Sequence, residues 1–304
     1  MLTRNVLGVL FALLAFTCTE AASPQSVSPN RSQPLPDSEV HERGMKLIEN
    51  QHKNDDAVDF YERTEHDVET TGGTAPHTIE DKLIRLVPNG AGTTKILLKD
   101  NGRPVTSAEY QRELETWLGI VQFMVDPGDD RAKSALAKYN KRKQERMHLV
   151  DALLTAFIPR WAGSEVRNGR DCDIFSLTPD PNFHPHSIFE EVLPHATAKI
   201  WVDHEANQLI RAEALITSDF SLGGGVLGKL YKGGTFTMEQ DEEVPGLWFP
   251  TRYQFDFSGR KFFFSFENHQ SIETSGYHYI GSAKDALALA QLELADPKPL
   301  AGDP

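Results

Sequence analysis

The chain has 304 residues, and its 31 basic and 44 acidic side chains give a formal net charge of −13. Hydrophobic residues make up 39%, enough to build a core in a chain of this length, which excludes a disordered chain and a polytopic membrane protein. The acidic balance argues against nucleic-acid binding, which needs a basic surface. Two cysteines are too few for a disulfide scaffold.

Residues 1–22 are typical of a cleaved export signal. Arg4 supplies the positive charge, residues 6–16 are apolar apart from one glycine, and small residues follow at Ala21 and Ala22. The apolar run is too short to span a bilayer, which needs roughly 20 residues. Residues 23–36, rich in Ser and Pro, are expected to form a flexible linker. We therefore expect a periplasmic or secreted protein with no transmembrane segment in the mature chain.

The two cysteines raise separate questions. Cys18 would carry a lipid in a bacterial lipoprotein, but Leu14 stands one place too early and Thr17 replaces the usual Gly or Ala, so lipid anchoring is the disfavoured alternative. After cleavage only Cys172 remains, which excludes an intramolecular disulfide. Its acidic sequence neighbours should raise the pKa of the thiol, which indicates a strand residue rather than a nucleophile.

The first third of the chain predicts a helix followed by strands. An apolar stripe predicts a helix over 37–53, capped by Asp37 or Ser38. From residue 57 the period changes to two, which predicts a long polar strand that includes Val58, Phe60 and Val68. Two short strands, 82–87 and 93–99, are joined by a glycine turn at 89–92, and Asn101-Gly102 closes a second turn.

A helical insertion is predicted over 106–157. Thr106 and Glu109 have capping-box spacing, and apolar residues then recur at helical intervals until Asp126-Pro127-Gly128. The second helix, 131–157, is basic over 131–146 and apolar afterwards. The basic part is interpreted as the solvated face of an amphipathic helix, with a membrane or partner docking surface as the alternative.

The remaining chain to about residue 280 predicts an antiparallel sheet with one apolar face. Asn168-Gly169 marks a hairpin within 165–178, and strands 198–203 and 209–216 are joined by a turn. Aromatic residues alternate with polar ones over 252–257, and Ser258-Gly259 is expected to turn the chain into the next strand. A short helix over 283–294 and a disordered tail, 296–304, complete the chain. Consecutive strands joined by turns predict an α+β fold.

The motifs for catalysis are incomplete. Gly223 to Lys229 has phosphate-loop spacing, but Leu230 stands where a hydroxyl must reach magnesium, so a glycine turn between strands is expected. The sequence lacks a nucleophile elbow. A set of histidines and glutamates has metal-ligand character but lies among prolines, which favours exposed side chains over a zinc site: His184, His186, Glu190, Glu191 and His195. No catalytic residue, metal or cofactor is assigned.

Several segments, in order, resemble exported bacterial proteins related to the outer-membrane lipoprotein-sorting proteins and the RseB-type regulator, the LolA-like half-barrel superfamily. They are Asn168-Gly169-Arg170, Phe175-Ser176-Leu177-Thr178-Pro179, Lys199-Ile200-Trp201-Val202-Asp203, Leu209-Ile210-Arg211-Ala212-Glu213, Gly223-Gly224-Gly225-Val226-Leu227-Gly228-Lys229-Leu230 and Val244-Pro245-Gly246-Leu247-Trp248-Phe249-Pro250-Thr251. The resemblance implies a single domain over 37–295 in which a strongly curved, unclosed antiparallel sheet wraps around amphipathic helices. It also implies a site for acyl chains.

The leading hypothesis is a non-enzymatic envelope protein that binds a hydrophobic ligand such as the acyl chains of lipids or lipoproteins, with another envelope protein as a candidate partner. Candidate cavity residues are Trp117, Leu118, Val121, Leu153, Phe157, Trp201, Trp248, Phe255 and Phe264. The same apolar residues could instead fill an ordinary core. Two other functions stay open: a secreted metal-dependent hydrolase that uses the 184–195 histidines, and an envelope signalling or scaffold module that docks through 131–146.

Overall fold

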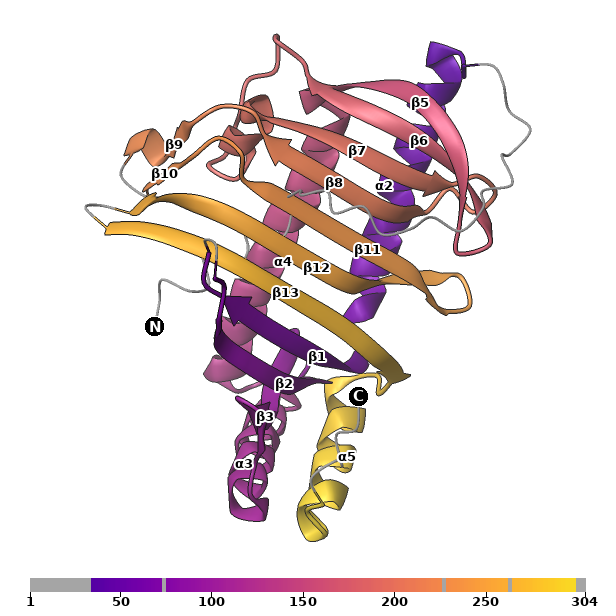
Figure 1. Cartoon of the computed structure of the whole chain (residues 1–304). Coiled ribbons are helices and arrows are strands. Elements are labelled where there is room, and N and C mark those ends of the chain that lie inside the picture. Colours follow the sequence, from indigo (N-terminus) through magenta and orange to yellow (C-terminus); the bar gives the residue numbers. More distant parts are fainter. Residues whose placement is uncertain (1–33, 73–74, 226–227, 262–263, 299–304) are drawn as a thin grey trace.

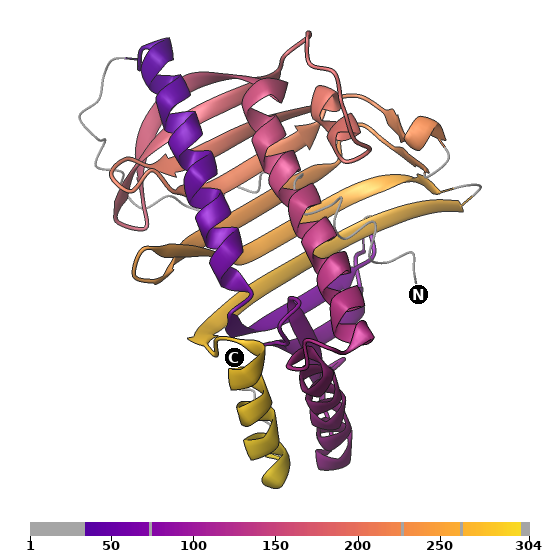
Figure 2. The ribbon, with the colours of Figure 1, turned by 180° about the vertical axis from the view of Figure 1, so that it is seen from behind.

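The computed structural model describes residues 34–72, 75–225, 228–261 and 264–298. The predictions for the signal, for most of the linker and for the end of the tail lie outside these residues. Within them, thirteen strands form one antiparallel sheet, and helices cover one of its faces (Figures 1 and 2). The α+β fold class with an unclosed sheet is therefore confirmed.

The elements follow the chain in this order. The helices are α2 (Asp37–Val58), α3 (Ser107–Met124), α4 (Asp130–Ala156) and α5 (Ala283–Ala295), with short 3-10 turns η1 (Glu190–His195) and η2 (Gly223–Gly225). The strands are β1 (Tyr61–Thr70), β2 (Thr78–Pro88), β3 (Thr93–Asp100), β4 (Arg103–Pro104), β5 (Phe157–Arg167), β6 (Arg170–Pro179), β7 (Ala196–Asp203), β8 (Leu209–Ile216), β9 (Phe220–Leu222), β10 (Gly228–Leu230), β11 (Thr235–Val244), β12 (Leu247–Lys261) and β13 (Phe264–Tyr279).

The sheet consists of two runs of consecutive strands that meet in its interior. Its order is β4-β3-β2-β1-β13-β12-β11-β8-β7-β6-β5, with the β9–β10 pair attached beside β12. Strand β1 pairs along its full length with residues 269–279 of β13, which joins the beginning and the end of the domain. Helices α3 and α4 connect β4 at one edge to β5 at the other, so the predicted helical insertion carries the chain across the whole sheet.

Local sequence signals explain most of the turns. Asn101-Gly102 and Asn168-Gly169 have positive φ at both residues, which is the backbone that two-residue hairpins with right-handed strand twist require. The Thr106 side chain accepts a hydrogen bond from the Glu109 amide while Glu109 accepts one from the Thr106 amide, so the predicted capping box starts α3. Strands β9 and β10 pair on either side of the glycine-rich segment, as expected for a turn.

Three sequence expectations about element boundaries were wrong. Helix α2 continues to Val58, so the strand expected from residue 57 begins only at Tyr61. Neither Asp37 nor Ser38 caps α2: Pro36 holds the N-cap position without a side-chain hydrogen bond. Finally, β12 runs through Ser258 and Gly259 to Lys261. A side chain at Gly259 would collide with the backbone oxygen of Lys229 and with the Phe266 ring, so this glycine permits close strand packing rather than a turn.

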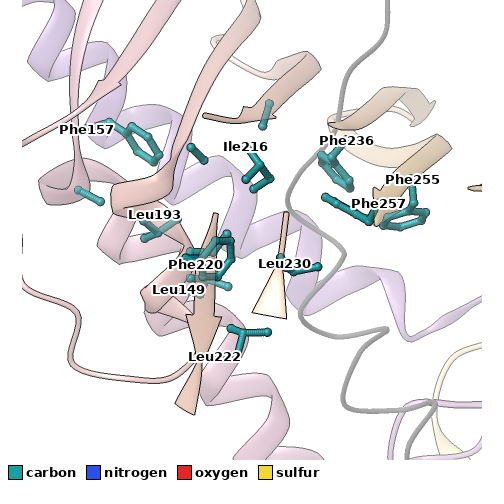
Figure 3. Close-up of a cluster of buried hydrophobic side chains, with 14 residues drawn as sticks. Leu149, Phe157, Leu193, Ile216, Phe220, Leu222, Leu230, Phe236, Phe255 and Phe257 are labelled. Atoms are coloured by element: carbon teal, nitrogen blue, oxygen red, sulfur yellow. The ribbon is translucent and has the colours of Figure 1, made fainter. Parts of the chain in front are cut away.

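Among the described residues, two of the four clusters of buried hydrophobic side chains are large, and they lie in different parts of the domain. The larger lies between the sheet, the C-terminal half of α4 and η1, and it includes the aromatic group Phe236, Phe255 and Phe257 (Figure 3). The smaller lies beyond β1, where α3 and α5 pack against β2 and β3 around the fully buried Trp117. Figure 2 shows α2 and α4 side by side across the face of the sheet, away from α3 and α5.

Candidate functional site

A cavity of about 430 Å³ lies between α2, α4 and the covered face of the sheet. This volume is within the range of small-molecule sites, roughly 300–1,000 Å³. Its lining comes from both helices and from six neighbouring strands, β5 to β8, β11 and β12, the last of which contributes Tyr253. The apolar lining side chains on the helices and on the other five strands include Val40, Leu47, Ile48, Met147, Leu149, Val150, Leu153, Leu154, Phe157, Phe175, Leu177, Ala198, Ile200, Val202, Leu209, Ala212, Ala214, Phe236 and Met238. Since neighbouring strands are about 4.8 Å apart, the lining extends roughly 24 Å across the sheet.

Small residues explain why the space between helices and sheet is not filled. Ala198, Ala212 and Ala214 lie on the inward face of β7 and β8, and Ala198 and Ala214 pair directly across the two strands. On the helix side, Gly44 lets α2 approach α4, because a Cβ at Gly44 would be only 3.3 Å from Leu154 Cδ2. The helices are therefore held close to each other above a floor in which three alanines lie among larger apolar side chains.

Polar contacts, rather than apolar packing alone, attach α2 to the sheet. Arg43 donates hydrogen bonds to Asp173, to Asn207 Oδ1 (3.0 Å) and to the backbone oxygen of Asp203 (3.2 Å). Farther along α2, Asn54 donates to Gln208 Oε1 (3.0 Å) and accepts from the Trp248 amide (3.1 Å). These contacts fix the helix at the tips of two strand pairs while leaving the apolar space beneath it open.

Asp173 is the most buried charge in this attachment, with 2% of its side chain exposed. Trp161 Nε1 donates to it (3.1 Å), and Arg43 and His204 Nδ1 contact its other oxygen. Burial acts to raise the pKa of Asp173, but the contacts with His204, Trp161 and Arg43 outweigh it and hold the pKa below the ordinary value of 3.8. The carboxylate is therefore charged at neutral pH and links α2 to β6.

At the end of the cavity near the C-terminus of α2, the lining includes the polar side chains of Gln51, His52, Asp55, Glu145 and Arg146. There, Arg146 Nε and Nη2 donate to the two carboxylate oxygens of Asp55 at 3.2 Å each, which joins α4 to α2. Gln51, one turn before Asp55, and Tyr253, on β12, line the cavity at the same end. Burial raises the pKa of Tyr253 above its usual value, so its hydroxyl keeps its proton at neutral pH. Among the described residues, this hydroxyl has no hydrogen-bond partner.

The structure brings only part of the candidate cavity set together. Leu153 and Phe157 line the cavity, and Phe255 lies in the adjoining core with its ring centroid 5.5 Å from that of Phe236. Trp117 and Val121 are fully buried in the smaller core, and Leu118 packs against them.

The remaining candidates point elsewhere. Trp201 alternates with the cavity residues Ile200 and Val202, so it faces the other side of the sheet, where it clusters with Trp248. Phe264 is 78% exposed at the start of β13. Sequence reasoning missed the contribution of α2 and the polar end, although the apolar stripe of α2 and the run of alanines facing inward were visible signals.

The residues considered for metal binding have other contacts. Glu190 accepts hydrogen bonds from the His186 amide (2.7 Å) and the Ser187 hydroxyl (3.0 Å), and Glu191 accepts one from the Gly223 amide (2.7 Å). His195 stacks on Phe220, with 5.0 Å between ring centroids. Within the described residues, no group of three His, Cys, Asp or Glu side chains is placed to hold one metal ion.

Cys172 and the basic part of α4 take structural positions. Cys172 is a buried residue of β6, and burial together with the charge of Asp203 raises the pKa of its thiol to about 11. The sequence also predicted a raised pKa for this thiol. However, the charge that raises it most belongs to Asp203 on the neighbouring strand β7, rather than to the aspartates that flank Cys172 in the sequence. On α4, Lys143 and Arg146 pair with acidic residues of α2, while most of the preceding basic side chains are exposed.

No protein-family model matches the chain, and no curated protein matches it. Solved structures do match at low identity. They include a LolA superfamily protein from Nitrosomonas europaea (10% identity, 77% of this chain and 92% of that chain, TM-score 0.30). A DUF1329 family protein from Desulfovibrio piger matches with 13% identity, 80% and 93% coverage and a TM-score of 0.30. A putative outer membrane lipoprotein-sorting protein domain from Vibrio parahaemolyticus matches with 10% identity, 78% and 93% coverage and a TM-score of 0.32.

These matches include the superfamily that the sequence segments resemble. Because the TM-scores are near 0.3, the functional proposal below depends on the cavity of this chain. Within the described residues, no helix is long and apolar enough to cross a membrane.

Proposed function

We propose that this protein binds an elongated hydrophobic ligand, such as the acyl chain of a lipid or lipoprotein, in the cavity beneath α2 and α4, without catalysing a reaction. The observation that carries the proposal is the apolar cavity of about 430 Å³ formed by both helices and six strands. Its length across the sheet suits a chain-shaped ligand better than a compact one. The export signal expected at 1–22 would place this activity in the cell envelope.

Hydrophobic burial is sufficient to drive such binding. Each CH₂ group moved from water into an apolar site contributes about 0.8 kcal/mol. A chain of about ten carbons could therefore contribute about 8 kcal/mol, which corresponds to micromolar affinity before the cost of ordering the chain. The proposal requires no catalytic group for this affinity.

The test combines ligand detection with a variant that fills the cavity. Native mass spectrometry of protein purified from a lysate that contains membranes should show co-bound lipid, and a fluorescent fatty acid should bind the delipidated protein. Ala212→Leu adds a branched side chain to the cavity floor and should abolish most of this fluorescence signal. Ala288→Leu, at an exposed position of α5, is the matched control and should bind as the wild type does. A wild-type protein without bound lipid or fatty-acid binding would contradict the proposal.

A further inference from the structure

The ends of the cavity differ in their hydrogen-bonding capacity. At the end near the beginning of α2, Arg43 uses its Nε and both Nη atoms on Asn207, Asp173 and the backbone of Asp203. That cation is thus already satisfied by protein groups. Around Val40, the neighbouring side chains are apolar, including Phe175 and Val202.

At the opposite end, donors remain without partners among the described residues. Tyr253 places a protonated hydroxyl on the cavity wall, and Arg146 uses only Nε and Nη2 in its contact with Asp55. Gln51 adds an amide on the same side of α2 as Asp55. Asn54, next to Asp55, accepts a hydrogen bond from the Trp248 amide of β12 (3.1 Å), so this end of α2 lies over the strand that carries Tyr253.

From this asymmetry we infer that the cavity binds its ligand in one orientation, with an oxygen-bearing head group at Tyr253 and Arg146 and the hydrocarbon tail directed toward Phe157 and Phe175. The ligand class is a fatty acid or an acyl chain with a carboxylate or ester oxygen next to it. This inference rests on the proposed function and adds the chemistry of the head group. A protonated hydroxyl at the wall of an apolar cavity can donate a hydrogen bond to an acceptor that the ligand supplies.

The physical basis is the difference between satisfied and unsatisfied donors in an apolar site. A small number of polar groups in an apolar pocket commonly fixes the orientation of its ligand. Tyr253 and Arg146 are both donors and favour an acceptor. Of the other carboxylates in the lining, Glu213 pairs with Arg211 (2.6 Å), and Glu145 is the acidic group that opposes this preference. The Asp55 carboxylate is held by two contacts with Arg146, which neutralise its repulsion of an acidic head.

The experiment uses the full mature chain and three probes. N-phenyl-1-naphthylamine, an apolar fluorescent probe, reports whether the cavity binds at all. It is then displaced by dodecanoic acid or by dodecyltrimethylammonium, which have the same chain length but opposite head groups. The variants are Tyr253→Phe, which keeps the ring, and the double change Asp55→Asn/Arg146→Gln, which removes both charges without leaving either unpaired. Tyr279→Phe, at a 61% exposed tyrosine, is the control, and thermal unfolding verifies that each variant folds.

We expect the wild type and Tyr279→Phe to bind the acid more tightly than the ammonium. Relative to its binding of the naphthylamine, Tyr253→Phe should bind the acid about tenfold more weakly, as expected for the loss of a hydrogen bond to a charged group. The double variant should reduce the preference for the acid further. If all proteins bind the naphthylamine and Tyr253→Phe keeps the wild-type preference, the orientation is wrong while the proposed function stands. If the wild type fails to bind the naphthylamine, the proposed function and the orientation are both wrong.

Discussion

The two largest hydrophobic cores among the described residues are built from similar residues but pack differently. In the smaller core, Trp117 is fully buried and donates a hydrogen bond from Nε1 to the Pro88 oxygen (2.9 Å), while Leu114 and Val121 fill the space around it. Under α2 and α4, alanines face the helices and a cavity remains. Alanines alone do not distinguish the two regions, because Ala286 and Ala290 of α5 are fully buried in the smaller core. The difference is that α3 and α5 pack on each other there, whereas α2 and α4 leave a cavity above the sheet.

The largest effect is expected when a large side chain is removed from the smaller core. Trp117→Ala should lower the free energy of unfolding by about 3–5 kcal/mol, because a large buried ring is lost and a cavity remains. Chemical denaturation measures this loss. Added indole should restore part of the stability by occupying the new space. Fatty-acid binding by the folded fraction should be unchanged, and a loss of that binding would show that the two cores are not independent.

The next largest effect is expected when the contacts that attach α2 to the sheet are removed. Arg43→Met leaves the buried Asp173 carboxylate without its cation and should cost about 3 kcal/mol in unfolding free energy. Because α2 forms one wall of the cavity, the variant should also bind fatty acid more weakly at neutral pH. Denaturation and fluorescence titration, performed on the same preparation, check both effects. Unchanged binding in a clearly destabilised variant would contradict the role assigned to α2.

Acidification should weaken the same attachment. The pKa of Asp173 in the folded protein lies below its ordinary value of 3.8, so its contribution to stability is complete above about pH 5. That contribution is lost as the pH falls below 3.8 and through the lower folded-state pKa. The unfolding free energy of the wild type should therefore fall with acid more steeply than that of Asp173→Asn. If the unfolding free energies of the two proteins depend equally on pH, the Asp173 carboxylate does not contribute to stability as described.

The smallest effect is expected for a substitution at Gly44, which tests how much space remains between α2 and α4. An alanine there favours the helix by roughly 0.5–1 kcal/mol, but its Cβ would be 3.3 Å from Leu154 Cδ2. Leu154 borders the cavity and has space to move, so we expect Gly44→Ala to stabilise the protein by about 0.5 kcal/mol. A destabilised variant would indicate that the space beside Leu154 is already filled.

The sequence allowed much of the fold to be predicted, because hairpin turns and caps depend on local residues. Asn168-Gly169 and the Thr106–Glu109 capping box needed only their neighbours to define the structure. The boundary near Val58 was missed because alternating and helical spacing coincide over a few residues. Residues in contact across the sheet, such as β1 with β13, are too distant in sequence for periodicity to relate them.

The candidate site was harder to predict for the same reason. Trp117 and Leu153 both lie on apolar helical stripes, and the sequence pattern of a stripe does not reveal what lies opposite it. Only the packing partners distinguish them: α5 fills the space beside Trp117, whereas Ala212 and its neighbours leave space near Leu153. In the sequence, Tyr253 is one of several aromatic residues that alternate along a strand. Its unpaired hydroxyl becomes apparent only in the folded structure.

The most direct test of the central claim is a crystal structure of the protein with 12-bromododecanoic acid, in which anomalous scattering locates the bromine at the end of the chain. We predict a bromine peak inside the cavity near Phe157 and Phe175, with the carboxylate beside Tyr253. A bromine beside Tyr253 would reverse the orientation only. An empty cavity, or one closed by α2 and α4 moving onto the sheet, would contradict the claim that this space is a ligand site.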